Sequence, residues 1–266
     1  LKSCPLNGKI IIGKQSMTNF LKKINQLDKK LNYGPIHNQV EEINAIVEHV
    51  ANQEVLPVTP APLGLLPDQF EDVADKLNEE QKVDLKAINN LLNSLRQFLS
   101  LKYGVWSLPN KKTATLIKQE LAVNSALEIM AGNAYWSKAL NEAGIRVIAT
   151  DSLEWAKTSS TGKQAFYPVV DLDAVSAIKK FAGADLILCS WAPNFGKSDL
   201  DVIRAWKKFT PESHLLFIGE KEGATNSPEF WENENFVNSP SLRKINRSFK
   251  SYDFIDEQIY EIKHEL

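Results

Sequence analysis

The stretch that decides the fold is SALEIMAGNAYW, residues 125–136. It begins as an apolar run of strand length, passes through a loop of small residues around Gly132, and continues into a helical pattern over Tyr135–Ala143. A glycine at a strand-to-helix turn lets the backbone approach a ligand closely, and the N-terminus of the following helix offers free N–H groups. The stretch therefore predicts a strand, a ligand-binding turn and a helix.

Downstream of this unit, further apolar runs of strand length alternate with helical patterns. The runs cover residues 145–150, 166–170, 184–189 and 214–219, and the helical patterns cover 174–181 and 198–209. Continuous apolar runs separated by helices predict a parallel sheet covered on both faces. The end of the chain differs: a polar stretch over 233–247 leads to 249–255 and 258–262, which we expect to pair as two closing antiparallel strands.

The part of the chain before Tyr103 has a different pattern. Residues 14–103 show helical spacing of apolar residues, broken at 33–35, by a proline-rich connector at 55–67, and near Asn78. We therefore divide the chain into a helical N-terminal region, 1–102, and an α/β domain, 103–266. Because residues 103–109 connect the two, the helices are expected to pack near the carboxyl edge of the sheet, and their surface could serve a homodimer.

The bulk composition restricts the class of protein. The chain has 266 residues, a net charge of −2, two cysteines and four histidines. The histidines lack metal-ligand spacing, so no metal site is predicted, and the apolar runs are too short for a membrane helix. These features favour a cytoplasmic protein, and the charge does not indicate a nucleic-acid partner. We predict that a local basic cluster lies in a solvated loop; it consists of Arg243, Lys244, Arg247 and Lys250.

Ligands of open α/β sheets bind at the carboxyl ends of the strands, so the residues after each apolar run are the candidate site. Asp151 follows the second run, 23 residues beyond Glu128, where a carboxylate can accept hydrogen bonds from a ribose diol. The alternative role is a helix N-cap, shared with Ser152. Asp171 or Asp173, after the third run, could accept the exocyclic amine of an adenine or could likewise cap a helix.

The fourth run ends at Ser190 and Trp191, followed by Pro193. A small polar residue, an aromatic residue and a proline can form the floor of a pocket, or a loop anchored by a buried tryptophan. The turn at Gly132 has a single glycine, whereas the dinucleotide-binding fingerprint has three. A nicotinamide-dependent oxidoreductase is therefore the least favoured hypothesis for this chain.

Five segments resemble a bacterial and fungal group of class I S-adenosylmethionine-dependent methyltransferase-like proteins. They are YGVWSLP (103–109), LEIMAGNAYW (127–136), VIATD (147–151), ADLILCSWAP (184–193) and LFIGE (216–220). The resemblance implies a Rossmann-like sheet of seven strands with antiparallel closing strands, S-adenosylmethionine as cofactor, and methyl transfer as the activity. The alternative is a non-catalytic binding or scaffold protein that keeps the methyltransferase fold.

The resemblance also implies roles for single residues. Glu128 would face the methionine part of the donor or order the turn, Asp151 would hold its ribose, and Trp106 would fold over the site. The transferred methyl group would lie near Ser190 and Trp191, the candidate catalytic residues. The full set of implied donor contacts is Trp106, Glu128, Ala131, Gly132, Asn133, Asp151, Ser152, Asp171, Asp173, Ala174 and Ser190.

The chain departs from the general methyltransferase pattern at three places. Met130 and Ala134 stand where the general motif has glycine, and Ser190–Pro193 keeps one proline of the (Asp/Asn)-Pro-Pro-(Tyr/Phe) motif of amino methyltransferases. The methyl acceptor is left open among a small molecule, a protein and an RNA.

Overall fold

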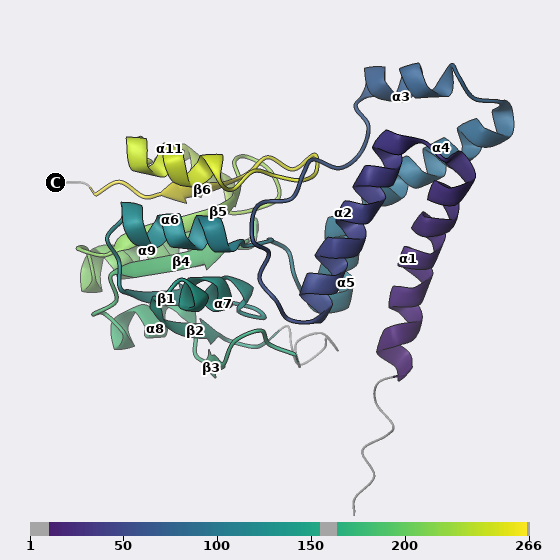
Figure 1. Ribbon diagram of the computed structural model, residues 1–266. Helices are drawn as coiled ribbons and strands as arrows, with labels where there is room; N and C mark the ends of the chain where they lie inside the picture. The colour runs from purple at the N-terminus through teal and green to yellow at the C-terminus, as the bar shows by residue number, and fades with distance from the viewer. Residues whose placement is uncertain (1–10, 155–163, 265–266) are drawn as a thin grey trace, which may run out of the picture.

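A computed structural model describes residues 11–154 and 164–264 of the chain. Its centre is a six-stranded sheet of order β3-β2-β1-β4-β5-β6, in which the first five strands are parallel and β6 is antiparallel to β5 (Figure 1). The strands are β1 Ser125–Ile129, β2 Arg146–Asp151, β3 Val169–Asp171, β4 Leu186–Ser190, β5 His214–Glu220 and β6 Glu257–Glu261. The predicted α/β architecture is confirmed.

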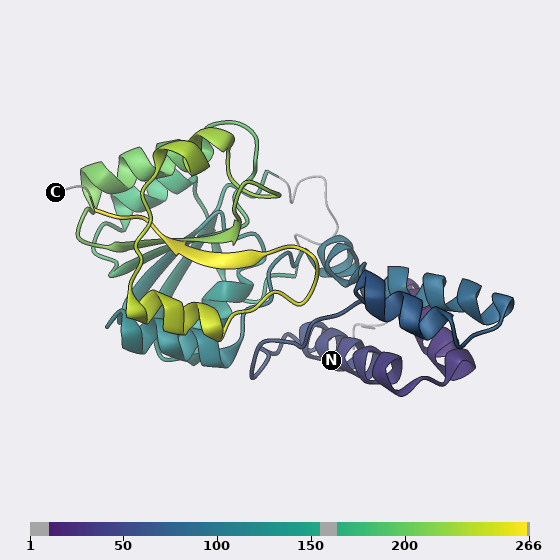
Figure 2. The same ribbon diagram turned by 90° about the horizontal axis from the view of Figure 1, so that it is seen from above.

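Helices cover both faces of the sheet (Figure 2). One face is covered by α6 (Lys111–Glu120), α7 (Tyr135–Glu142) and α11 (Pro240–Arg247), and the other by α8 (Ala174–Lys180), α9 (Ser198–Phe209) and α10 (Pro228–Asn233). Two apolar layers result, one on each side. The central strands β1 and β4 are therefore buried on both faces, which explains why their sequences read as continuous apolar runs.

The N-terminal region consists of helices, as the periodicity predicts. They are α1 Ile11–Leu31, α2 Gly34–Ala51, α3 Pro67–Ala74, α4 Glu79–Leu92 and α5 Leu95–Tyr103. The predicted break near Asn78 is present, because Asn78 and Gln81 form a capping box at the start of α4. A second break was not predicted: the Asn93 side chain donates to the Asn89 carbonyl at 2.9 Å and competes with the helical pattern there. No helix within residues 11–154 and 164–264 is long and apolar enough to cross a membrane.

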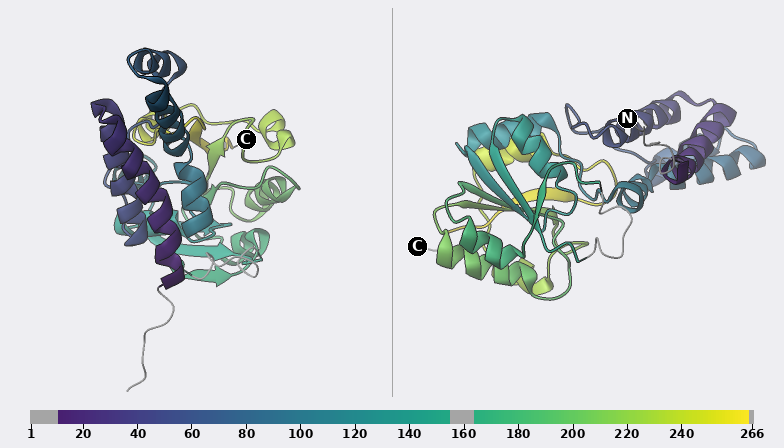
Figure 3. Two further views of the ribbon diagram at one scale, coloured as in Figure 1. Left: turned by 90° about the vertical axis from the view of Figure 1, so that its right-hand side faces the viewer. Right: turned by 90° about the horizontal axis from the view of Figure 1, so that it is seen from below.

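The helical region lies beside the carboxyl ends of the parallel strands, as expected (Figures 1 and 3). Its connector reaches the α/β part directly. The Tyr135 hydroxyl donates to the Glu54 carbonyl at 2.6 Å, and Leu63 N–H donates to the Tyr252 carbonyl at 2.7 Å. One continuous apolar cluster runs from α1 and α2 into β1 and α7, so the helices form one wall of the region above the strand ends.

The closing part of the sheet differs from the expectation. In the described residues the sheet has six strands, and residues 249–256 form an irregular loop in place of the strand predicted at 249–255. The outer edge of β6 is closed by other groups: the Asn246 side chain both donates to the Ile259 carbonyl and accepts from its N–H, each at 2.9 Å. Val237 N–H donates to the Glu261 carbonyl at 2.9 Å. A side-chain amide thus takes the place of a neighbouring strand.

Asn246→Ala is therefore expected to lower the free energy of unfolding by about 1–2 kcal/mol, because it leaves two backbone groups of the edge strand without a protein partner. Urea denaturation of the variant measures this. Asn238→Ala is the control, since its amide meets only the exposed Arg243, and a change below about 0.5 kcal/mol is expected there. Equal losses in the two variants would contradict the edge-closing role.

Candidate functional site

A cavity of about 670 Å³ lies at the carboxyl edge of the sheet, between the strand ends and the helical region. Every residue predicted for the site lines it, except Asp171. Pro193, expected in the pocket floor, also lines the cavity. Further lining residues were not predicted: Ser100, Gly104, Val105, Ser107, Met130, Tyr135, Trp136, Val175, Ser198 and Asp201. Candidate residues that follow β1, β2, β3 and β4 are thus brought together in one place.

The turn after β1 keeps a left-handed shape at alternate residues. Met130, Gly132 and Ala134 have φ angles of 51°, 54° and 56°, so the two positions without glycine adopt the same conformation as the glycine between them. The left-handed conformation costs a residue other than glycine about 1–2 kcal/mol, and other contacts offset this cost. Ala134 is fully buried, whereas Met130 lines the cavity with its sulfur 3.9 Å from Cys189 Sγ. The departures from the motif therefore leave the turn intact but place a thioether at the cavity wall.

Glu128 orders the helix that follows the turn. The N-cap residue of α7, Ala134, has no side-chain acceptor, and Glu128 Oε2 accepts from Ser137 N–H at 2.7 Å and from Ser137 Oγ at 2.5 Å. The carboxyl group is buried, and this burial raises its pKa to about 8, with a further contribution from the negative charge of Asp151. Glu128 thus holds the first turn of α7, and it also lines the cavity.

Asp151 ties the end of β2 to the turn. Its Oδ2 accepts from Gly132 N–H at 2.9 Å and its Oδ1 from Leu153 N–H at 2.7 Å, the second bond forming an Asx turn. The side chain is buried at the cavity wall. Asp151 therefore starts no helix within the described residues, and its carboxylate lies against the glycine turn.

The two acidic residues after β3 have different surroundings. Asp173 caps α8 by accepting from Ser176 N–H at 3.0 Å, a hydrogen-bonded contact that lowers its pKa, and it also lines the cavity. Asp171 is exposed and does not line the cavity, although it is the register partner of Asp151. Asp173 thus both caps α8 and lines the cavity.

Two tryptophans, Trp106 and Trp191, form one wall of the cavity. Trp106 and Trp191 are stacked, with ring centroids 5.4 Å apart and an interplanar angle of 27°. Trp106 is 51% exposed, and Trp191 follows Ser190 with a left-handed φ of 56°. The Trp191 indole N–H donates to Glu257 Oε1 at 2.8 Å. Trp191 is therefore held in a defined orientation at the end of β4.

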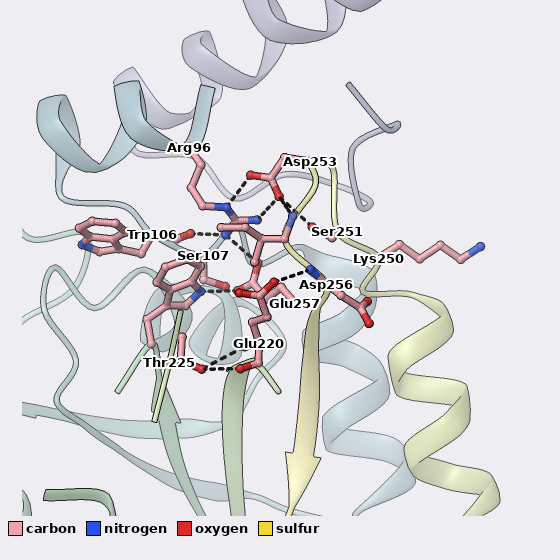
Figure 4. Close-up of polar contacts among 12 residues, drawn as sticks. Arg96, Trp106, Ser107, Glu220, Thr225, Lys250, Ser251, Asp253, Asp256 and Glu257 are labelled. Carbon is pink, nitrogen blue, oxygen red and sulfur yellow. Dashed lines mark hydrogen bonds and ion pairs between the residues drawn. The ribbon is translucent and has the colours of Figure 1, made fainter. Parts of the chain in front are cut away.

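A buried ion-pair cluster behind this wall was missed by the sequence analysis (Figure 4). Arg96, on α5, donates to Asp253 at 2.7 and 3.0 Å and to Glu257 Oε2 at 2.9 Å. One signal could have revealed Arg96: it is a charge on the buried stripe of Leu92, Leu95 and Leu99. Its two partners lie 157 and 161 residues away, so no local pattern could have indicated them.

Glu220 and the basic cluster lie outside the cavity. Glu220 accepts from Ala224 N–H at 2.8 Å in its own loop. The predicted loop around the basic cluster is wrong, because Arg243, Lys244 and Arg247 lie on helix α11. Lys244 pairs with Glu120 at 2.5 Å, and the other three basic residues line a separate groove beside β6. The described residues contain no group of three or more His, Cys, Asp or Glu side chains that could hold a metal ion.

Comparisons with known proteins identify methyltransferase structures. No family model and no curated protein matches the chain. The S-adenosylmethionine-dependent methyltransferase SibL in its apo form has 14% identity and a TM-score of 0.39, covering 95% of this chain and 76% of SibL. Magnesium protoporphyrin IX methyltransferase from Synechocystis PCC 6803, with bound SAM, has 14% identity and a TM-score of 0.36, covering 58% of this chain and 79% of that protein.

A candidate type II methyltransferase from Anaeromyxobacter dehalogenans has 18% identity and a TM-score of 0.31, covering 40% of this chain. This chain spans 46% of the length of that protein. Because identities and scores are this low, the function of the chain has to be inferred from its own residues.

Proposed function

We propose that the protein is an S-adenosylmethionine-dependent methyltransferase. The observation that carries the proposal is the contact between Asp151 and the turn: Asp151 Oδ2 accepts from Gly132 N–H at 2.9 Å, so a buried carboxylate and a left-handed turn meet at the cavity. A carboxylate at this place can accept from a ribose diol. The cavity of about 670 Å³ lies within the range of small-molecule sites.

A buried polar atom at the cavity supports a polar ligand. Asn133 Nδ2 donates to the Tyr103 carbonyl, whereas its Oδ1 is buried without a hydrogen-bond partner in the structure. Since buried polar atoms are nearly always paired, this oxygen is suited to accept from the amino group of a bound donor molecule. Asp173, Ala174 and Val175 line the cavity near the start of α8 and would edge the adenine.

The bound cofactor would supply a methyl group on a cationic sulfonium. The residues of this chain supply alignment and electrostatics: the turn and Asp151 orient the donor, and the buried carboxylate of Asp151 places negative potential near a cation. The wall of Trp106 and Trp191 borders the side where Ser190 lies and where an acceptor would approach. Transfer of this kind depends mainly on the alignment of donor and acceptor.

The lining also restricts the acceptor. Among the described residues that line the cavity, four are acidic and none is Lys, Arg or His. These acidic residues are Glu128, Asp151, Asp173 and Asp201. Glu128, whose pKa is raised to about 8, is mostly protonated at neutral pH, and Asp201 is paired with Arg204. An anionic acceptor would still meet Asp151 and Asp173 and no basic lining residue, so the acceptor is expected to be neutral or cationic, with an apolar or aromatic surface that packs on the exposed ring of Trp106.

Calorimetric titration with S-adenosylmethionine and S-adenosylhomocysteine tests the donor site. Micromolar binding is expected for the wild type, and Asp151→Asn is expected to weaken it about 10- to 100-fold, because hydrogen bonds to a charged group are lost. Asp171→Asn is the matched control: the same change at the neighbouring strand end, outside the cavity, should leave the affinity within about twofold.

Each outcome has a separate meaning. Unchanged affinity in Asp151→Asn would remove the assigned role of Asp151. Absence of binding to the wild type would contradict the methyltransferase proposal and favour a scaffold that has only the fold. Titration with NAD and NADH in the same buffer covers the oxidoreductase alternative, for which no heat of binding is expected.

A further inference from the structure

Arg96 connects the helical region to the tryptophan wall of the cavity. Its guanidinium donates through Nη1 to the Trp106 carbonyl at 2.5 Å and to Glu257 Oε2 at 2.9 Å. Its carbon Cζ lies 4.9 Å from the ring centroid of Trp191. One side chain on α5 therefore contacts both members of the stacked pair.

Glu257 transmits the position of Arg96 to Trp191. Its two carboxylate oxygens have different partners: Oε2 accepts from Arg96, and Oε1 accepts from the Trp191 indole N–H at 2.8 Å. Both Arg96 and Glu257 are buried. Figure 4 shows Arg96 pointing from the helix toward Glu257 at the start of β6, with Trp106 on the other side. The Glu257 carboxylate thus bridges the Arg96 guanidinium and the Trp191 indole.

Trp191 needs such support, because its backbone is in the left-handed region with φ of 56° and its ring is only partly buried. A strained residue persists where its surroundings over-determine it, and such residues concentrate at ligand sites. The support comes from β6 and α5, which are separate in the sequence from the strand that carries Trp191.

We propose that Arg96 is a positioning residue for the acceptor side of the cavity: through Glu257 and the Trp106 carbonyl, it holds the Trp106–Trp191 pair in place, so that helix α5 sets the wall against which the acceptor binds. The acceptor role of this wall rests on the proposed methyltransferase function. The arrangement of the two indoles does not, and it can be measured without any substrate.

The test uses circular dichroism of the full chain, because two stacked indoles give an exciton couplet. Trp106→Phe identifies the couplet by abolishing it. Arg96→Lys keeps the charge but loses the planar fork, and the couplet is expected to fall by about half or more. The affinity for S-adenosylhomocysteine, measured by calorimetry, should stay within about threefold of the wild type, since Asp151 and the turn at Gly132, which carry the proposed donor site, are unchanged.

Asp253→Asn is the matched control. It removes the other ion pair of Arg96 but leaves the line from Arg96 through Glu257 to Trp191, so the couplet should keep about its full amplitude even where stability is lost. A merely structural role of Arg96 would reduce the couplet equally in both variants. That result would overturn the proposal.

A second variant is used if Arg96→Lys does not fold. Arg96→Met/Asp253→Asn/Glu257→Gln removes the three buried charges together and leaves no uncompensated ion. Its couplet is expected to fall as in Arg96→Lys, and an unchanged couplet would refute the positioning role. Failure of the wild type to bind S-adenosylhomocysteine would instead contradict the proposed function, whatever the couplet shows.

Discussion

Replacing Arg96 with methionine is expected to lower the free energy of unfolding by about 3–5 kcal/mol, one of the two largest effects predicted for this chain. Arg96 is buried together with Asp253 and Glu257, whose side chains are 3% and 2% exposed. Burial acts to lower the pKa of Arg96, but the neighbouring negative charges, Glu257 foremost, raise the pKa above its ordinary value. The guanidinium therefore stays charged, and its removal leaves two carboxylates buried without a cation.

The measurement is urea denaturation of Arg96→Met beside the charge-free triple variant. The triple variant should recover most of the loss, because neutral groups of similar volume can replace a buried ion cluster at little cost. A triple variant as unstable as Arg96→Met would mean that Arg96 stabilises the protein through packing on Trp191 and Tyr252, whose ring centroids lie 4.9 and 4.6 Å from Cζ.

The second large effect is a pH dependence of stability that originates in Glu128. The folded state raises the pKa of this group from 4.5 to about 8, chiefly by burial, so the folded chain holds the proton more tightly than the unfolded chain. The stability contributed by this group is fully present below pH 4.5 and is lost as the pH rises toward 8. The slope in this window reaches about 1.4 kcal/mol per pH unit at most.

Glu128→Gln is expected to remove this slope, because the amide cannot ionise and its oxygen can still accept from Ser137. Thermal or urea denaturation of the wild type and the variant at pH 5 and pH 8 measures this slope. The free energy of unfolding of the variant, relative to that of the wild type, should increase as the pH rises. His214, which pairs with Glu261 at 2.6 Å, also has a raised pKa, so the stability that it contributes is likewise lost as the pH rises. It is present in both proteins, so it cancels in the difference. Parallel pH profiles would contradict the assignment to Glu128.

Much of the fold was determined by local sequence alone. The mainly apolar runs of β1 and β4 predict buried parallel strands, because burial on both faces favours apolar residues at successive positions. The stripe of α2, from Ile36 to Val50, predicts a helix packed on one side, and its members are buried as expected. The cavity position of Asp151 also followed from sequence, since strand ends of a parallel sheet converge at one edge.

Other features were decided only by tertiary structure. The edge of β6 is closed by Asn246, whose role depends on a distance of 13 residues and on the turn that brings α11 back to the strand. Asp171 was expected at the site but is exposed, because β3 is the outermost strand and ends beside the cavity rather than in it. Neither outcome is contained in the local pattern of the residues concerned.

The difference between the features that follow from local sequence and those that depend on tertiary structure has a physical reason. Periodicity and strand-end position are set by backbone geometry, which acts over a few residues and is therefore written into local sequence. A buried ion cluster such as Arg96, Asp253 and Glu257 joins groups more than 150 residues apart, and its charges are tolerated only because the fold brings them together. The sequence by itself determined the sheet, the turn and the acidic strand ends, and the tertiary structure decided which of those groups face one cavity and what holds its tryptophan wall.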